Sequence, residues 1–186
     1  MPFSQRHLPH LWVIGRPLFV TFRLYDSLPA GREFPKDAMT SGKAFACLDR
    51  LLDEYRESPR YLQMPSVAGV VVNAIRLGAD TGYLLHAWVV MPNHVHLLIT
   101  PQSEVPKLMQ NLKGSTARYA NRLLGRTGTP FWQNESYDRL VRDADEFRKI
   151  ENYILQNPVR AGLAVSAEQY VWSSAYTESG LKPAAG

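Results

Sequence analysis

Cysteine is nearly absent from the chain, which has one such residue, Cys47, among 186. A single cysteine excludes an internal disulfide and a zinc cluster built from cysteine thiolates. No apolar run reaches the roughly 18 residues that a membrane-spanning helix needs. The first ten residues also lack the basic head and apolar core of a secretory signal. We therefore expect a cytoplasmic protein without membrane contact.

The rest of the composition is that of an ordinary globular domain, with 45% hydrophobic and 20% charged residues. We expect one domain over residues 1–186, in which residues 163–186 form a C-terminal extension or tail. The net charge of +4 favours a polyanionic partner such as nucleic acid.

Hydrophobic period and turn signals divide the chain into alternating strands and helices. The expected strands cover residues 17–26, 82–91 and 94–100, and a short strand lies within 136–142. The expected helices cover residues 37–57, 66–77 (with Ser66 as N-cap, ended by Gly78), 105–124 and 143–157 (ended before Pro158). This mixture predicts an α+β fold, a two-layer sandwich whose central antiparallel sheet has helices on one face.

The helix expected over residues 105–124 has a basic stripe opposite its apolar one. The expected core stripe consists of Leu108, Leu112, Tyr119 and Leu123. On the other side, arginines recur every four residues with a lysine nearby: Arg118, Arg122, Arg126 and Lys113. Such a stripe is compatible with a solvated helix face or with a set of phosphate contacts.

Two of the five histidines stand one residue apart in the expected strand VVMPNHVHLLIT. Because side chains alternate along a strand, His94 and His96 point to one face and Val95 to the other. Two imidazoles so placed are able to share a metal ion or a phosphate. The alternative interpretation is a hydrogen-bonded or surface histidine pair at the start of a strand.

The last expected helix places Tyr153 and Asn157 four residues apart, and therefore on the same face. Phe147, Ile150 and Ile154 supply its packing side. The residues alone leave open whether Tyr153 is a functional tyrosine or one that belongs to the core or its rim.

The strings MPNHVHLLI and YILQNPVRAGL together resemble the REP-associated tyrosine transposases. These belong to the single-tyrosine HUH transposases, in which HUH denotes histidine, an apolar residue and histidine. The resemblance extends over RPLFVTFRL, FWQNESYDRLVRD and YVWSSAY, and so over most of the chain. It implies a ferredoxin-like sandwich.

The resemblance also assigns roles to residues. It implies that Tyr153 is the nucleophile and that His94, His96 and Asn157 bind a divalent metal, with Gln156 as a rival to Asn157. The expected ion is Mg²⁺, with Mn²⁺ as a possible substitute because imidazole favours softer ions. The implied reaction cleaves single-stranded DNA, forms a 5′-phosphotyrosine and frees a 3′-hydroxyl that allows later strand transfer.

The implied partner is single-stranded hairpin DNA, for which the expected contacts are Lys113, Arg118, Arg122 and Arg160. Trp132 and Tyr137 are candidates for stacking on unpaired bases, although core packing explains Trp132 equally well. Asn93 either orients the neighbouring His94 or serves the turn.

We expect a monomer rather than a homodimer, closed over its site by a C-terminal segment that includes Trp172 and Tyr176. Two other functions stay open. The first is a protein that binds hairpin nucleic acid and whose catalysis is vestigial. The second is an unrelated small metalloenzyme built on the histidine pair, which would leave Tyr153 without a role.

Overall fold

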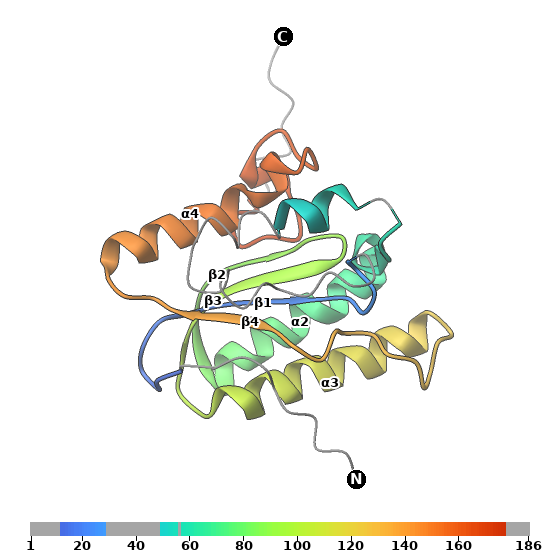
Figure 1. Cartoon of the computed structure of the whole chain (residues 1–186), viewed down its shortest axis with the longest axis horizontal. Coiled ribbons are helices and arrows are strands. Elements are labelled where there is room, and N and C mark those ends of the chain that lie inside the picture. The colour runs from blue at the N-terminus through green and yellow to red at the C-terminus, as the bar shows by residue number, and fades with distance from the viewer. Residues whose placement is uncertain (1–11, 29–48, 56, 178–186) are drawn as a thin grey trace.

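A four-stranded antiparallel sheet lies at the centre of the computed structural model, which describes residues 12–28, 49–55 and 57–177 (Figure 1). The sheet has the strand order β2-β3-β1-β4. Its strands are β1 (Leu18–Arg23), β2 (Tyr83–Val90), β3 (His94–Pro101) and β4 (Tyr137–Leu140). Two helices, α2 (Pro65–Thr81) and α3 (Val105–Leu123), form the crossovers β1 to β2 and β3 to β4. This order confirms the predicted α+β, ferredoxin-like fold.

Helices cover both faces of the sheet. Figure 1 shows α2 and α3 below the strands and α4 (Ala144–Arg160) above them. The two crossover helices share one face as predicted, whereas α4 forms a layer on the other face, where the prediction of helices on one face had put none. Within the described ranges, no helix combines the length and the apolar character that crossing a membrane requires.

The sheet therefore separates two cores. Beneath it, Val95, Leu97 and Ile99 of β3 pack with the apolar sides of α2 and α3. Above it, Phe19 and Leu98 pack with Ile154 and its neighbours on α4. The alternation of side chains along β3 places the two histidines in the upper layer, under α4.

Helix α3 has the predicted bounds but a different core stripe. Tyr119 and Leu123, expected in the core, are 54% and 55% exposed. Small and polar residues take their place, because the indole of Trp132 packs there and donates to Thr116 Oγ1 at 2.9 Å. The buried positions of α3 are Val105, Met109, Leu112, Thr116, Ala120 and Asn121.

The last helix runs past its expected end. Asp143 caps α4 by accepting a hydrogen bond from Glu146 N, as its sequence position suggests. Pro158 lies inside the helix, which continues to Arg160 instead of ending at Asn157. A proline removes only one backbone donor, and Asn157 O still accepts from Ala161 N at 3.0 Å. The extension keeps Arg160 on the helix.

Helix α2 also differs from its expected bounds. It begins after Met64 rather than after Ser66, and it continues through Gly78 to Thr81. Gly78 is needed for packing rather than as a stop signal: a Cβ there would lie 2.5 Å from the hydroxyl oxygen of Tyr83. That hydroxyl donates to Ile75 O at 2.7 Å. The glycine therefore lets β2 begin directly against the helix.

The helix expected over residues 37–57 is described only in part, because residues 37–48 lie outside the described ranges. Residues 49–54 are helical as predicted, and Leu52 is buried. This short stretch also brings Asp49 into the molecule, with 4% of its surface exposed.

Two glycines of α2 allow a matched test of this packing. We expect Gly78→Ala to lower the free energy of unfolding by about 1–3 kcal/mol, because the added methyl group overlaps the ring of Tyr83. Gly69→Ala meets no atom within 4 Å and should raise it by up to about 1 kcal/mol through helix propensity. Urea unfolding of both variants measures the difference, and equal stabilities would contradict the packing role of Gly78.

Candidate metal and tyrosine site

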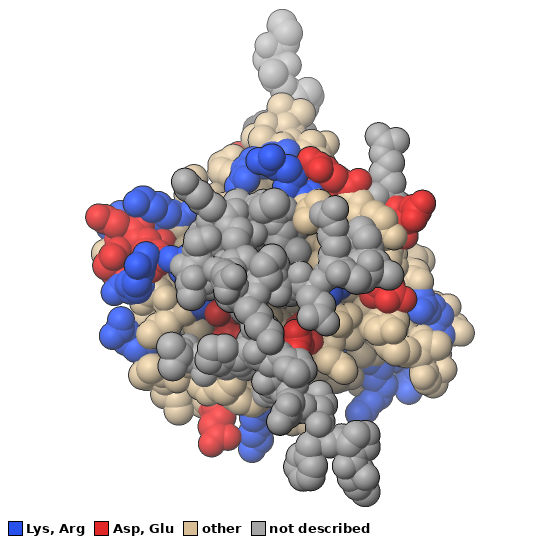
Figure 2. Space-filling model, in the orientation of Figure 1, with Lys and Arg blue, Asp and Glu red and all other residues tan. Residues whose placement is uncertain are grey.

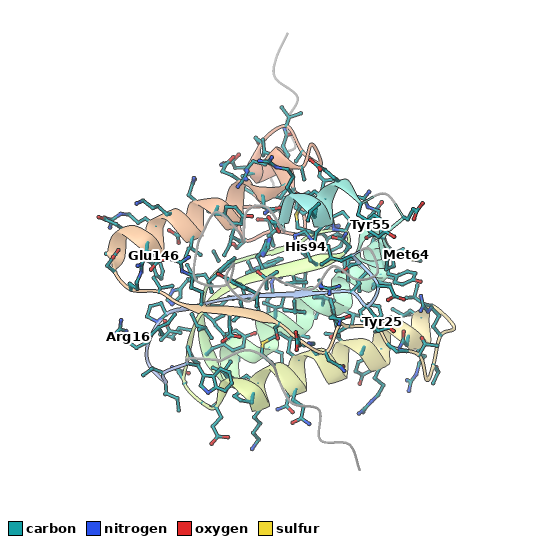
Figure 3. The ribbon with its side chains drawn as sticks, viewed as in Figure 1. Arg16, Tyr25, Tyr55, Met64, His94 and Glu146 are labelled. Carbon is teal, nitrogen blue, oxygen red and sulfur yellow. The ribbon has the colours of Figure 1, made fainter. Side chains whose placement is uncertain are left out.

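The histidine pair lies on the central strand β3, on the face that α4 covers. His94 is registered with Arg23 and His96 with Thr21 of β1. Both imidazoles have no exposed surface. Figure 3 shows His94 in the upper layer, beneath the end of α4. The predicted common face of the two histidines is thus observed, and the alternative of a surface pair is excluded.

Each imidazole is held through its Nδ1 atom. Asn93 Oδ1 lies 2.7 Å from His94 Nδ1. The amide of Asn93 donates to Leu52 O and to Ser58 Oγ, each at 2.7 Å, so its oxygen is left to accept from His94. Asn93 therefore orients His94, which was one of its two expected roles.

Thr21 holds the second imidazole, with its Oγ1 2.7 Å from His96 Nδ1. A partner on Nδ1 fixes the ring and favours the tautomer whose Nε2 carries a lone pair. The two Nε2 atoms then face each other at 3.1 Å. Lone pairs directed at one point are the arrangement of a histidine metal site.

A carboxylate that sequence reasoning missed completes this cluster. Asp49 Oδ1 lies 3.2 Å from His94 Nε2 and 3.0 Å from His96 Nε2. The ligand atoms of the three residues lie within 4.8 Å of one another. Burial by itself raises the pKa of Asp49, but positive charge at the facing imidazoles of His96 and His94 outweighs it and brings the pKa well below its usual range, and a cation bound between them would act in the same direction. The carboxylate is therefore ionised at neutral pH.

Helix α4 presents three of the predicted site residues on one face. Tyr153, Asn157 and Arg160 recur at the spacing of successive helical turns. Asn157 is 2% exposed, and its Nδ2 lies 2.8 Å from Asp49 Oδ2 and 3.3 Å from His96 Nε2. Gln156, the rival ligand, has no hydrogen bond to the cluster among the described residues.

The hydroxyl of Tyr153 donates a hydrogen bond to Asp49 Oδ2. Its ring lies 5.8 Å from the ring of His96, and the guanidinium carbon of Arg160 lies 4.8 Å from its centroid. Burial, followed by the charge and hydrogen bond of Asp49, raises the pKa of Tyr153, which Arg160 partly opposes. The phenol is thus held protonated and pointed at the histidine cluster.

The donor set fits a divalent cation. Asp49 Oδ1 and Asn157 Oδ1 are buried and accept no hydrogen bond among the described residues. A buried anionic oxygen beside two imidazole lone pairs is costly unless a cation or proton satisfies all three. Two nitrogens with carboxylate and amide oxygens suit Mg²⁺, Mn²⁺ or Zn²⁺. The residues present are therefore able to hold the predicted ion.

Comparison with known proteins finds one family model that matches part of the chain. The family model described as "Transposase IS200 like" matches residues 73–157, which include both histidines, Tyr153 and Asn157. This match covers residues 73–157 and shows that this part of the chain is similar to the IS200-like transposases. The predicted resemblance is thereby confirmed. No curated protein matches the chain.

Two solved structures are similar to this chain. A REP-associated tyrosine transposase bound to a REP hairpin superposes with a TM-score of 0.58 at 17% identity, over 91% of this chain and 82% of the other. A putative transposase from Deinococcus radiodurans R1 gives a TM-score of 0.35 at 16% identity, over 84% of this chain and 98% of the other. At 17% identity, the similarity to the REP-associated transposase shows a shared fold and no more.

The expected DNA contacts of this chain divide between the two faces of the sheet. Arg160 lies at the site, whereas Arg118 and Arg122 are exposed on α3, on the opposite face. Lys113 Nζ donates to Gln133 O at 2.6 Å and to Asn134 O at 2.9 Å. Figure 2 shows basic atoms at the lower right, over the end of α3.

The two aromatic residues expected to stack on bases are in the core instead. Trp132 is 6% and Tyr137 2% exposed. Trp132 packs edge-on against Phe22 at 4.8 Å, and Tyr137 packs against Phe19 at 6.1 Å. The stacking prediction is wrong for both residues, since their strand and bridge positions direct them inward.

Thr21 allows a test of the imidazole geometry. Thr21→Val keeps the side-chain shape but removes the hydroxyl beside His96 Nδ1, and we expect Mn²⁺ affinity to fall about 10- to 100-fold. Thr21→Ser retains a hydroxyl and should bind nearly as tightly as the natural chain. Calorimetric titration measures both, and undiminished binding by Thr21→Val would show that this hydrogen bond does not orient the ligand.

Proposed function

We propose that this chain is a metal-dependent single-strand DNA endonuclease and strand transferase that recognises hairpin DNA and cleaves it through a 5′-phosphotyrosine. One observation carries the proposal. The carboxylate of Asp49 contacts the Tyr153 hydroxyl through one oxygen and both imidazole Nε2 atoms through the other. A nucleophile and a metal-ligand pair thus meet in one buried place.

The proposed ligands are His94, His96, Asp49 and Asn157. Turning the Asn157 amide by half a turn exchanges Nδ2 for Oδ1, which directs an oxygen toward His96 Nε2. A divalent cation, Mg²⁺ or Mn²⁺, supplies a Lewis acid for the scissile phosphate when it is bound. Asp49 is the one member of this set that the sequence resemblance did not supply.

Tyr153 carries out the bond exchange. The phenol gives its proton to Asp49 Oδ2 as its oxygen forms a bond to phosphorus, the bond from phosphorus to the 3′ oxygen breaks, and that oxygen leaves as a 3′-hydroxyl after taking up a proton from solvent. Asp49 Oδ2 accepts the hydrogen bond from the phenol and so aims its oxygen at the imidazole pair. The phosphotyrosine keeps the energy of the broken bond, which allows transfer to another strand.

The proposed substrate rests on charge and on the related structure. Arg160 stands over the ring of Tyr153, where it can contact the phosphate being cleaved. Arg118 and Arg122 form no ion pair within the described part of the chain and are available to a hairpin stem. The related transposase is bound to a REP hairpin, which supports a hairpin partner here.

A monomer is proposed because one chain supplies the whole site. Tyr153 reaches Asp49 and the histidines of its own chain. The C-terminal segment then pairs with the edge of β2, where Val90 N donates to Trp172 O at 2.8 Å. Trp172 of this segment packs against the core beneath the sheet, on the face opposite the histidines, so the closing role expected for it finds no support here.

Tyr153→Phe tests the nucleophile. The ring and its contacts with His96 and Arg160 remain while the oxygen is lost, so we expect no covalent adduct and nearly unchanged hairpin binding. A denaturing gel of protein incubated with hairpin-bearing single-stranded DNA measures the adduct, and fluorescence anisotropy measures binding.

Tyr170→Phe is the matched control. Tyr170 is also half-buried and donates to Val90 O at 2.9 Å, but it does not contact the metal cluster. It should retain the adduct. An adduct of normal yield in Tyr153→Phe would remove Tyr153 from the mechanism, and no adduct in the natural chain would favour a binding protein with vestigial catalysis.

The burial of the site also predicts the form of the substrate. His94 and His96 have no exposed surface, so a phosphate reaches them only on a flexible strand that can be threaded beneath α4. We expect cleavage of the single strand beside a hairpin and none of the continuous duplex of the same sequence. Equal cleavage of both in one assay would point to a general nuclease.

A further inference from the structure

An aromatic surface lies at the end of the sheet where β3 begins, formed by Tyr25, Tyr61, Met64 and Arg126. Tyr25 is 43% and Met64 45% exposed. The guanidinium carbon of Arg126 lies 4.6 Å from the ring centroid of Tyr61. The ring of Tyr61 also stacks with that of Phe131, with ring centroids 6.3 Å apart and an interplanar angle of 24°. Tyr25 is exposed at this surface, while the ring of Tyr61 is half-buried and also packs against the core beneath the sheet.

Backbone hydrogen bonds tie this surface to the turn that carries His94. Leu62 N, next to Tyr61, donates to Pro92 O at 3.1 Å. Leu24 N, next to Tyr25, donates to Asn93 O at 2.8 Å. Figure 3 shows Tyr25 and Met64 at the same end of the sheet as His94, with Glu146 at the other end. The aromatic surface is therefore held at a fixed position relative to the site.

The surface also borders the exposed arginines of α3. The helix ends at Leu123, and Gly125 reverses the chain with a φ of 65°, which turns Arg126 onto Tyr61 instead of continuing the basic stripe. Arg126 has no acidic partner among the described residues. A strand that runs from α3 to the His94 site passes from one face of the sheet to the other across this end.

We propose that unpaired DNA bases stack on the aromatic surface, between the stem contacts on α3 and the cleavage site. The inference rests on the function proposed above and names a contact for the strand that enters the site. Tyrosine rings and a guanidinium plane accept any base by stacking, while the charge of Arg126 suits the phosphates. The buried Trp132 and Tyr137 are unable to serve in this way.

The test measures binding apart from cleavage. Tyr153→Phe protein is titrated with a labelled single-stranded DNA oligonucleotide, with and without the further change Tyr25→Leu or Tyr61→Leu. Each leucine should weaken binding by about five- to 100-fold, the range of one lost base stack. Tyr61→Phe keeps the flat ring and should bind like the parent. Unchanged affinity in both leucine variants would overturn the proposal.

Two controls separate stacking from a structural effect. Leu84→Ala removes an exposed apolar side chain at the start of β2, which the strand register places far from His94, and should leave binding unchanged. The leucine variants should also keep the Mn²⁺ affinity of the parent, since the turn is intact. Loss of Mn²⁺ binding together with DNA binding would mean that the tyrosines only support the fold, against the proposal.

A second readout uses 2-aminopurine, whose fluorescence responds to stacking, at successive unpaired positions beside the hairpin. We expect a position that responds to the parent protein and not to Tyr61→Leu; no such position would contradict the stacking surface. The outcome is independent of cleavage. If bases stack but the natural chain forms no adduct, the stacking surface is supported and the proposed enzyme is refuted. If an adduct forms but no base stacks, the proposed enzyme is supported and the stacking surface is refuted.

Discussion

The two faces of strand β3 pack against different helical layers, and the arrangement of the rest of the molecule depends on this division. Its odd-numbered residues are apolar and join the core beneath the sheet, while His94 and His96 face α4. Because β3 is a central strand and α4 covers this face of the sheet, neither histidine is exposed to solvent. The fold thus places two imidazoles in a dry interior with their separation fixed by the strand.

A buried polar cluster of this kind costs stability, and its composition indicates what it is for. An apolar replacement of similar volume is often as stable as a buried charged group or more so. Here Thr21 and Asn93 hold the imidazoles, and Asp49 and Asn157 direct further polar atoms to the same point. Such convergence is expected where a cation is to be bound, and the Tyr153 hydroxyl, the proposed nucleophile, lies beside it.

Local sequence patterns predicted much of the structure. The turn and alternation around His94 and His96 predicted both strands and the common face, and helical spacing placed Tyr153 with Asn157. Non-local contacts could not be read in this way. Asp49 meets Tyr153 across 104 residues of sequence, and no neighbour of Asp49 in the chain signals that contact. In addition, the residues that directly precede Asp49 lie outside the described ranges.

The wrong predictions share a physical cause, which is that tertiary packing overrode a local rule. Pro158 and Gly78 were expected to end helices, but buried neighbours keep both inside. Trp132 fills the space beside Thr116, so small residues of α3 face the core and Tyr119 faces solvent. The layer occupied by α4 depends on apolar residues of β1 and β2 that periodicity alone does not assign to a face.

The central claim is that Asp49, His94, His96 and Asn157 hold one divalent cation beside Tyr153. Anomalous diffraction from crystals soaked in Mn²⁺ tests it most directly. The account predicts a single strong peak about 2 Å from Nε2 of both histidines, with Asp49 Oδ1 also within bonding distance. A peak elsewhere, or none at a concentration that supports cleavage, would contradict it.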